Sequence, residues 1–381
     1  MLALCAGLLP AVSENDAGTV RLVCLNIGKA DCMLLLYRDH AFLIDTGYGQ
    51  NYPALEMMLR QYGIEHLDGV FLTHCHEDHQ GGLAPLAQSG LPVDAWYASR
   101  FYRKSEEGRH PAVQAAASRN QDVSWLAAGD TIAVGKDASF AVLGPMNLDE
   151  SNENNNSLVM RFSSPQGSIL FAGDMKEDEE NELLEADAFT PCDVLKVAHH
   201  GDNKATTKEM LQIVRPQAAV ILTSTQEEPD TPASSTLKRL KKVNCEVYVS
   251  QDWHDALQLT LKNGKVSAED IQWDNVPSRA ENIALSIDVY QDILTIYNQG
   301  SEEISLRGCC VYSTKGNELV ELPDAQVLPG GQFVIGSRLT AVPVNENTMS
   351  NRIWNKSSLD MAILYDAYGR PLACTDNGLG E

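Results

Sequence analysis

Residues 74–79 read His-Cys-His-Glu-Asp-His, and they follow the apolar run Val70–Thr73. The apolar run predicts a buried strand that delivers these six residues to a loop at its end. Side chains two apart in an extended loop project to the same side, so the first two histidines can bind one ion together. Asp78 and His79 can then face a neighbouring ion. Imidazole and carboxylate ligands suit Zn²⁺ and also Mn²⁺, so the stretch predicts two divalent ions, with zinc favoured and manganese as the alternative.

Two other strand-like runs end in residues of the same chemical kind. Asp193–Ala198 leads directly into His199 and His200, and another apolar run ends in Asp174. If the first strand continues, the two adjacent histidines point to opposite sides, so we expect one to bind metal and the other to contact substrate. Asp174 is placed to bridge two ions. Its simpler alternative is to cap the acidic helix that begins at Glu177.

The charge of the chain limits its partners. Its 381 residues include 52 acidic and 29 basic side chains, a formal charge of −23. So acidic a surface repels polyanions, which disfavours extended nucleic-acid binding but allows a local site for a phosphodiester. Lys196 and Lys204 lie close in sequence to the histidine pair and could attract an anion, although we expect both to be solvated. The nine cysteines form no Cys-x-x-Cys pair and are interpreted as small buried hydrophobes.

Changes in pattern along the chain predict two domains. Residues 1–18 begin with an almost wholly apolar segment, which predicts a signal-peptide remnant or a disordered start. Strand-like and helix-like runs alternate over 19–272, which is typical of a layered α/β fold. We expect a linker at 273–282 and a small all-β, immunoglobulin-like sandwich at 283–381. The sequence has no run of about 18 apolar residues, so no membrane span is expected.

Six segments, taken in order, resemble the metallo-β-lactamase superfamily, and they look most like the hydrolase domain of ComEC-type DNA-internalisation competence proteins. These segments are Val23–Gly28, Leu43–Gly47, Thr73–His79 with Gly81-Gly82, Asn156–Val159, Gly173-Asp174 and Val197–Gly201. The resemblance covers roughly residues 19–261. It implies a four-layer αββα sandwich with the metal ions at one edge of the sheets.

Carried over residue by residue, the resemblance also implies a set of metal ligands. The set is His74, His76, Asp78, His79, Asp174 and a histidine at His199 or His200. It further implies that Asp45 steadies the ligand loop from outside. Many relatives have another histidine between the first cluster and Asp174, where this chain has only His110, in a loop-like stretch. Asn154–Asn156 lie nearer the expected place, and asparagine is a poor ligand, so we expect one ion to be held loosely.

The C-terminal residues resemble a lamin-tail domain. The likeness rests on Leu294–Gly300, Ile304–Gly308, Val327–Ile335 and Leu364–Leu372. Bacterial domains of this kind are often joined to secreted hydrolases. The resemblance therefore implies an extracellular or cell-surface location and a domain that binds a surface or a protein partner. A purely stabilising sandwich and a cytoplasmic location remain the alternatives.

Two adjacent ions favour hydrolysis, because they lower the pKa of a shared water towards about 7. We expect Asp78 to orient this water. His200, if it is the histidine not needed for metal, is expected to assist at the transition state or the leaving group. The resemblance indicates phosphodiester substrates, nucleic acid among them. The alternatives are another ester or amide, such as phosphorylcholine or a β-lactam, and a non-catalytic surface-binding protein.

Overall fold

The computed structural model describes residues 18–106, 108–272, 282–313, 315, 318–336, 353–357, 359–366 and 371–379. The predicted start, 1–18, and the predicted linker, 273–282, lie almost wholly outside these residues. Within them, one compact unit draws on 18–47, 59–80 and 91–272. The other unit draws on 48–58, 81–90 and the residues that follow 281. Each unit is described by itself.

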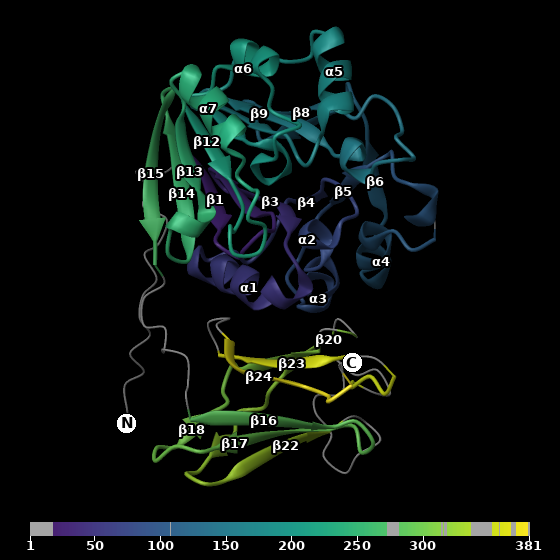
Figure 1. The fold of residues 1–381 in the computed structure, drawn as a ribbon, viewed down its shortest axis with the longest axis vertical. Helices are drawn as coiled ribbons and strands as arrows, with labels where there is room; N and C mark the ends of the chain where they lie inside the picture. Colours follow the sequence, from purple (N-terminus) through teal and green to yellow (C-terminus); the bar gives the residue numbers. More distant parts are fainter. Residues whose placement is uncertain are drawn as a thin grey trace. The chain divides into compact units, whose positions relative to one another are not determined.

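The first sheet of the larger unit has eight strands (Figure 1). In spatial order they are β15 (Lys265–Ile271), β14 (Ala256–Lys262), β1 (Val20–Leu25), β2 (Cys32–Tyr37), β3 (His40–Thr46), β4 (Gly69–Leu72), β5 (Trp96–Ser99) and β6 (Val123–Leu126). Neighbours from β15 to β3 are antiparallel, and those from β3 to β6 are parallel. All four residues of β4 are buried, as expected for a parallel strand that is covered on both faces.

The second sheet repeats this plan with seven strands. In spatial order they are β13 (Glu246–Val249), β12 (Ala218–Ile221), β11 (Val194–Lys196), β10 (Gly167–Phe171), β9 (Val159–Ser164), β8 (Ala138–Gly144) and β7 (Thr131–Val134). The strands from β7 to β10 are antiparallel, and those from β10 to β13 are parallel. Both sheets are therefore mixed, with a parallel part that can carry ligand loops at its carboxyl ends.

Apolar side chains from the two sheets form a shared core. Phe71 and Phe140 are fully buried there, with ring centroids 4.8 Å apart. Close packing of this kind stabilises the two sheets face to face and fixes the strand ends that carry polar residues.

Helices of the larger unit cover the outer faces of its sheets. The α-helices of the described residues are α1 (Tyr52–Gln61), α2 (Glu77–Gln80), α3 (Leu83–Gln88), α4 (Pro111–Ser118), α5 (Glu177–Glu185), α6 (Lys208–Val214) and α7 (Ser234–Lys242). A second apolar cluster, which includes Leu183, Met210 and Leu240, packs α5, α6 and α7 against the second sheet. Helix α4 contacts β5 and β6 of the first sheet. The predicted four-layer αββα sandwich is confirmed.

The C-terminal region is all β, as predicted. Its small sheets contain β16 (Ile283–Asp288), β17 (Ile293–Asn298) and β22 (Gln332–Gly336); β18 (Ile304–Ser305) and β21 (Gln326–Val327); and β20 (Glu318–Glu321), β19 (Cys310–Ser313), β23 (Met361–Tyr365) and β24 (Pro371–Asp376). Every pair is antiparallel. Leu294, Val311 and Trp354 are buried in its core. The likeness to a lamin-tail domain stays a prediction. In the described part of the chain, no helix is long and apolar enough to cross a membrane.

Candidate metal centre

Strand ends from both sheets bring polar residues to one edge of the larger unit. The parallel neighbours β3 and β4 in the first sheet lead to Asp45 and to residues 74–79. The parallel neighbours β10 and β11 in the second sheet lead to Asp174 and to the pair at 199–200. Because parallel strands end at the same side, the two sheets deliver the predicted ligands to a common place.

Asp174 lies at the middle of this cluster. Its Oδ2 atom is 3.2 Å from Nε2 of His79 and 3.3 Å from Nε2 of His200. The Nε2 atoms of His74 and His199 each lie 4.0 Å from the same oxygen. Four imidazoles thus converge on one carboxylate that is 2% exposed.

The backbone before Asp174 explains why its carboxylate points to the middle of the cluster. Gly173 has a φ of +50°, and a Cβ at this position would lie 2.7 Å from Cβ of Ser157. A side chain is therefore excluded both by conformation and by space. The Asp174 amide then donates to Oγ of Ser157, at 3.0 Å. The Gly-Asp pair of the sequence reflects a forced turn rather than a helix cap, since Lys176 occupies the N-cap of α5.

One half of the centre, which we call the buried half, consists of Asp78, His79 and His200. Helix α2 carries Asp78 and His79 inward, and Oδ2 of Asp78 lies 3.3 Å from Nε2 of His200. The Nδ1–H of His200 donates to the carbonyl oxygen of Leu222 at 2.7 Å, which directs Nε2 towards the centre. His79 Nδ1 is 2.8 Å from Oδ2 of Asp45. Both Nε2 atoms therefore face the centre as potential ligands.

Asp45 contacts the residue that precedes the ligand loop, and its role in steadying that loop stays a prediction. Its carboxylate accepts from the Thr73 amide and from Oγ1 of Thr73, both at 2.8 Å. Asp45 is fully buried with a φ of +57°, a left-handed conformation that aspartate tolerates better than most residues.

The other half, which we call the open half, consists of His74, His76 and His199. His74 Nε2 lies 3.0 Å from Nδ1 of His76, so these two nitrogens share one side as predicted. His199 Nε2 lies 3.3 Å from Nδ2 of Asn154. The side chain of His199 is 18% exposed, whereas that of His200 is fully buried. Asn154, one of the three asparagines expected near the missing histidine, therefore lies beside the open half.

The pair at 199–200 does not continue a strand, contrary to our expectation. Strand β11 ends at Lys196, and both histidines have left-handed backbones, with φ values of 46° and 53°. Both rings turn towards Asp174 instead of projecting to opposite faces. The alternation rule fails here because the chain has already left the sheet.

Several buried atoms of the centre have no hydrogen-bond partner among the described residues. They include His79 Nε2, His200 Nε2 and Asp174 Oδ1. Such orphaned ligand atoms are costly unless something else binds them. Ligand atoms also gather in two buried triads, His74-His79-Asp174 and Asp31-His79-His200. The donor set fits divalent metal ions, and the two triads suggest a binuclear metal site.

The electrostatics of the two halves differ. Burial lowers the pKa of His74 well below its ordinary value and that of His199 to about 4. Burial also opposes charge on His200, but the carboxylates of Asp174 and Asp78 raise its pKa to about 9. Metal binding in the buried half must therefore displace a proton from His200, and acid should weaken it.

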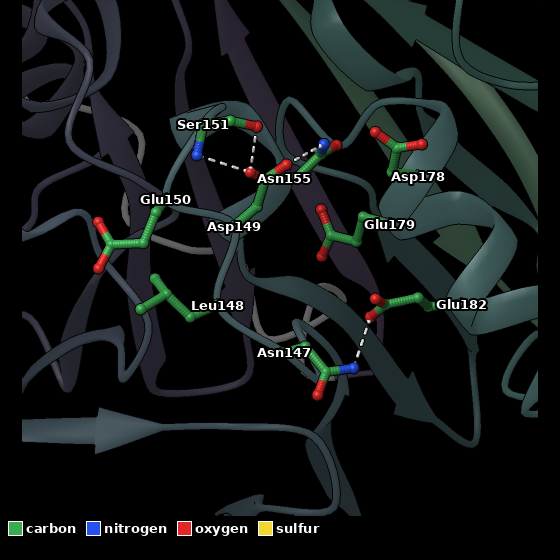
Figure 2. Close-up of a pocket in the computed structure, with 9 residues that line it drawn as sticks. All are labelled: Asn147, Leu148, Asp149, Glu150, Ser151, Asn155, Asp178, Glu179 and Glu182. Atoms are coloured by element: carbon green, nitrogen blue, oxygen red, sulfur yellow. Dashed lines mark hydrogen bonds between the residues drawn. The ribbon is translucent and has the colours of Figure 1, made fainter.

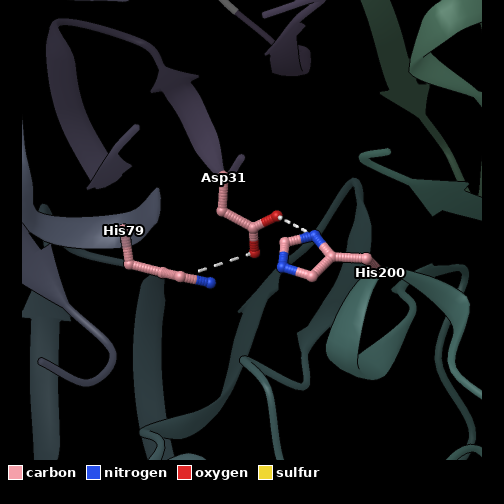
Figure 3. A group of neighbouring side chains, drawn as sticks. All are labelled: Asp31, His79 and His200. Atoms are coloured by element: carbon pink, nitrogen blue, oxygen red, sulfur yellow. Dashed lines mark ion pairs between the residues drawn. The ribbon is translucent and has the colours of Figure 1, made fainter. Parts of the chain in front are cut away.

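Asp31 and Lys196 belong to the centre, and sequence reasoning missed both. Lys196, expected to be solvated, is fully buried; it forms an ion pair with Asp31 and donates to the carbonyl of Gly173 at 3.0 Å. Asp31 faces Nδ1 of His79, at 3.8 Å, and Nδ1 of His200, at 3.5 Å (Figure 3). These are the ring nitrogens that point away from Asp174. We therefore place Asp31 behind the ligands, although it is part of a triad.

A signal for this pair does exist in the sequence. Asp31 directly precedes the apolar run Cys32–Tyr37, and Lys196 stands inside another apolar strand. A charged side chain in a strand that is covered on both faces is buried, and a buried charge needs a partner of opposite charge.

Three other polar residues lie away from the centre. His110 is 4% exposed and packs against Tyr102 and Trp125, with ring centroids 4.8 and 4.9 Å away. His254 is exposed and pairs with Asp270. Lys204 is exposed, as expected. The histidine between the first cluster and Asp174 is thus a packing residue.

Comparison with known proteins agrees with this fold and site. Residues 25–225, more than half of the chain, match the family described as the Metallo-beta-lactamase superfamily. With the αββα sandwich and its buried His/Asp clusters, this match shows that the chain belongs to the metallo-β-lactamase superfamily. The match ends at residue 225, so it does not identify the C-terminal all-β region.

Individual relatives are distant. The chain is 27% identical over 257 residues to ComE operon protein 3 of Bacillus subtilis (63% of this chain, 33% of that protein). It is 25% identical over 263 residues to Competence protein ComA of Neisseria gonorrhoeae (68% and 34%). It is 26% identical over 211 residues to Ribonuclease J of Synechocystis sp. (51% and 31%). The chain spans about a third of the length of these relatives, and it is distantly related to the competence proteins.

Proposed function

We propose that this protein is a hydrolase that uses a water activated by two divalent metal ions, and that it acts on phosphodiesters. One observation carries the proposal: four imidazole Nε2 atoms lie 3.2–4.0 Å from a single oxygen of the buried Asp174. Unpaired ligand atoms in a fixed cluster support metal binding better than a purely structural role.

The ligand set follows from which atoms face the centre. In the buried half, Asp78, His79 and His200 would hold one ion. In the open half, His74 and His76 would hold the other, and Asp174 would bridge the two. Bound ions of this kind would lower the pKa of a shared water and polarise the bond to be cleaved. Zinc is our first choice because the set is rich in imidazole, with manganese as the alternative.

Asp78 is proposed to orient the attacking water. Burial opposes its charge, but the nearby His200 and His79 hold its pKa well below the usual range. The carboxylate is therefore anionic at neutral pH and can accept a hydrogen bond. Its Oδ2 also lies 3.1 Å from Nζ of Lys29, which is partly exposed and could meet an anionic substrate.

We assign the role of the spare histidine to His199, in place of the His200 of the sequence-based prediction. His200 is fully committed between Leu222, Asp78 and Asp174. His199 is partly exposed and can reach a substrate. It can stabilise the transition state or protonate the leaving group.

The choice of phosphodiesters rests on the relatives. One is named as a ribonuclease and another as a competence protein. The charge of −23 argues against a long nucleic-acid footprint and favours a short segment bound at the ions. A bridging aspartate, where many lactamases have a cysteine, makes a β-lactam a weaker candidate substrate.

The test combines metal analysis with three substrates: bis(p-nitrophenyl) phosphate, plasmid DNA and nitrocefin. We expect two equivalents of metal and cleavage of the phosphodiesters. His76→Ala should lower turnover strongly, while the exposed control His254→Ala should not. No turnover by the metal-loaded protein, or turnover that His76→Ala leaves unchanged, would refute the hydrolase. Cleavage of nitrocefin alone would refute the phosphodiester preference.

A further inference from the structure

A polar cavity lies beside α5, outside the cluster around Asp174. Its volume is about 400 Å³, and Figure 2 shows its lining. The lining residues come from the loop after β8, from Asn155 and from one face of α5: Asn147, Leu148, Asp149, Glu150, Ser151, Asn155, Asp178, Glu179 and Glu182. Five of the nine are acidic, none is basic or aromatic, and Leu148 is the one apolar side chain.

Glu179 distinguishes this cavity from an ordinary acidic surface. Its side chain is buried, with 3% of the residue exposed, and it projects from α5 into the cavity (Figure 2). Neither carboxylate oxygen has a hydrogen-bond partner among the described residues. The adjacent Glu180, also buried, accepts from the amides of Thr206 and Thr207, at 2.6 and 2.9 Å. The same helix thus satisfies one buried glutamate and leaves its neighbour unpaired.

Three of the other acids of the lining accept from donors, and the fourth, Asp178, is exposed. Asp149 accepts from Ser151 and from Asn155 Nδ2, and Glu182 accepts from Nδ2 of Asn147. These bonds hold the loop against α5 and keep the carboxylates in place. Glu179 is therefore the buried acid of the lining for which neither oxygen has a hydrogen-bond partner among the described residues.

A buried carboxylate without donors is unfavourable. Burial and the nearby Glu182 both raise the pKa of Glu179 well above its ordinary value. The N-terminus of α5 favours negative charge, but four consecutive acids, 177–180, share that field. A bound cation would remove this cost, since buried charges are stable when they are paired or coordinate a metal.

We propose that this cavity binds a hard divalent cation of the Ca²⁺ class. The Glu179 carboxylate is the central ligand, Glu182, Asp178 and Asp149 flank it, and water completes the shell. An all-oxygen lining suits such an ion, which takes carboxylate, amide and water oxygens. An organic ammonium ion is less suited, because its usual recognition uses aromatic faces that this lining lacks. Cation binding at this site does not require the protein to be a hydrolase.

The position of the cavity links it to the metal centre. Asn155 lines it and belongs to the short 3-10 helix Glu153–Asn156. The preceding residue, Asn154, contacts His199, and Glu153 accepts from the Cys75 amide at 3.4 Å. A cation on one side of this helix would therefore steady the residues that support the open half.

Calorimetric titration of the zinc-loaded protein with CaCl₂ tests the proposal. Zinc occupies the histidine centre, and Ca²⁺ binds imidazole ligands poorly. The titration with Ca²⁺ therefore measures binding at the new site. We expect one Ca²⁺ with a dissociation constant on the order of 10⁻⁵–10⁻³ M. Glu179→Gln should weaken binding at least about tenfold, as expected for loss of a charged ligand. The matched control Glu185→Gln, exposed on the same helix and outside the cavity, should leave it unchanged.

Three results would overturn the site. They are no binding of Ca²⁺ or Mg²⁺ by the wild type at millimolar concentration, binding that Glu179→Gln leaves intact, and binding of methylammonium in place of the divalent ions. If Glu179→Gln does not fold, the double variant Asp178→Asn, Glu182→Gln takes its place. It keeps Glu179 and should still weaken Ca²⁺ binding, and unchanged binding would count against the proposal.

Discussion

The two halves of the metal centre are built differently. In the buried half, His79 and His200 are each fixed from behind, by Asp45 and by the carbonyl of Leu222, with Asp31 close to both. In the open half, His199 is partly exposed and its neighbour is an asparagine. Outer partners that orient a ligand raise metal affinity. We therefore expect one ion to bind tightly in the buried half and the other to bind loosely in the open half.

Asp174 faces histidines of both halves, so its replacement should have the largest effect. Asp174→Asn should abolish the second equivalent of metal and lower phosphodiester turnover by on the order of 10³-fold, because the ions supply several kcal/mol at the transition state. Bound metal is measured by mass spectrometry, and turnover with bis(p-nitrophenyl) phosphate. The exposed Asp122→Asn serves as the control. Retention of both ions by Asp174→Asn would show that this residue does not bridge them.

The support of the buried half is tested by Asp31→Asn. The change leaves the fully buried Lys196 with only the Gly173 carbonyl and Asp174, whose Oδ1 is 3.5 Å away. Removing one partner of a buried pair costs about 3–5 kcal/mol of unfolding free energy. Urea denaturation of the metal-loaded protein measures the loss.

The double variant Asp31→Asn, Lys196→Met provides the control for this prediction. It removes both charges, so most of the lost stability should return. A loss below about 1 kcal/mol in the single variant, the range of exposed ion pairs, would mean that the pair is solvated in solution.

The open half can be strengthened instead of broken. Asn154→His places an imidazole where Asn154 now contacts His199, at a position that is 7% exposed. We expect the weaker ion to bind on the order of tenfold more tightly, about 1.4 kcal/mol, with the tighter ion unchanged. Competition with a chromogenic chelator resolves the two affinities. Equal affinities for the two ions in the wild type would show that the two halves do not differ in metal binding.

Much of this arrangement could be predicted from the sequence. Periodicity and strand-end motifs predicted the layered α/β fold, the all-β C-terminal region and the residues that meet at Asp174. The predictions worked because ligands sit directly after apolar strands, so a local pattern determines where they go.

What could not be predicted depends on contacts between distant segments. Asp31 and Lys196 pair across 165 positions of sequence, from 31 to 196, so the apolar residues around each can indicate burial but not the partner. The left-handed turn at 199–200 contacts β12, and the apolar run before it does not show that the strand already ends at Lys196. The unpaired state of Glu179 likewise appears only when α5 meets the loop after β8.

The smallest effect is expected for replacement of His110, which also tests whether His110 is a ligand of the open half. Its burial between Tyr102 and Trp125 lowers its pKa to about 4, so the folded protein holds it neutral. The unfolded chain, with an ordinary histidine pKa of about 6.5, binds a proton first as the pH falls. Stability is therefore intact above about pH 6.5 and is lost progressively as the pH falls towards 4. Between pH 7.5 and 5.5, the unfolding free energy of His110→Phe should fall by about 1 kcal/mol less than that of the wild type. The metal content should be unchanged. Urea denaturation of both proteins at pH 7.5 and 5.5 measures the difference, and a fall in bound metal would instead make His110 the missing ligand of the open half.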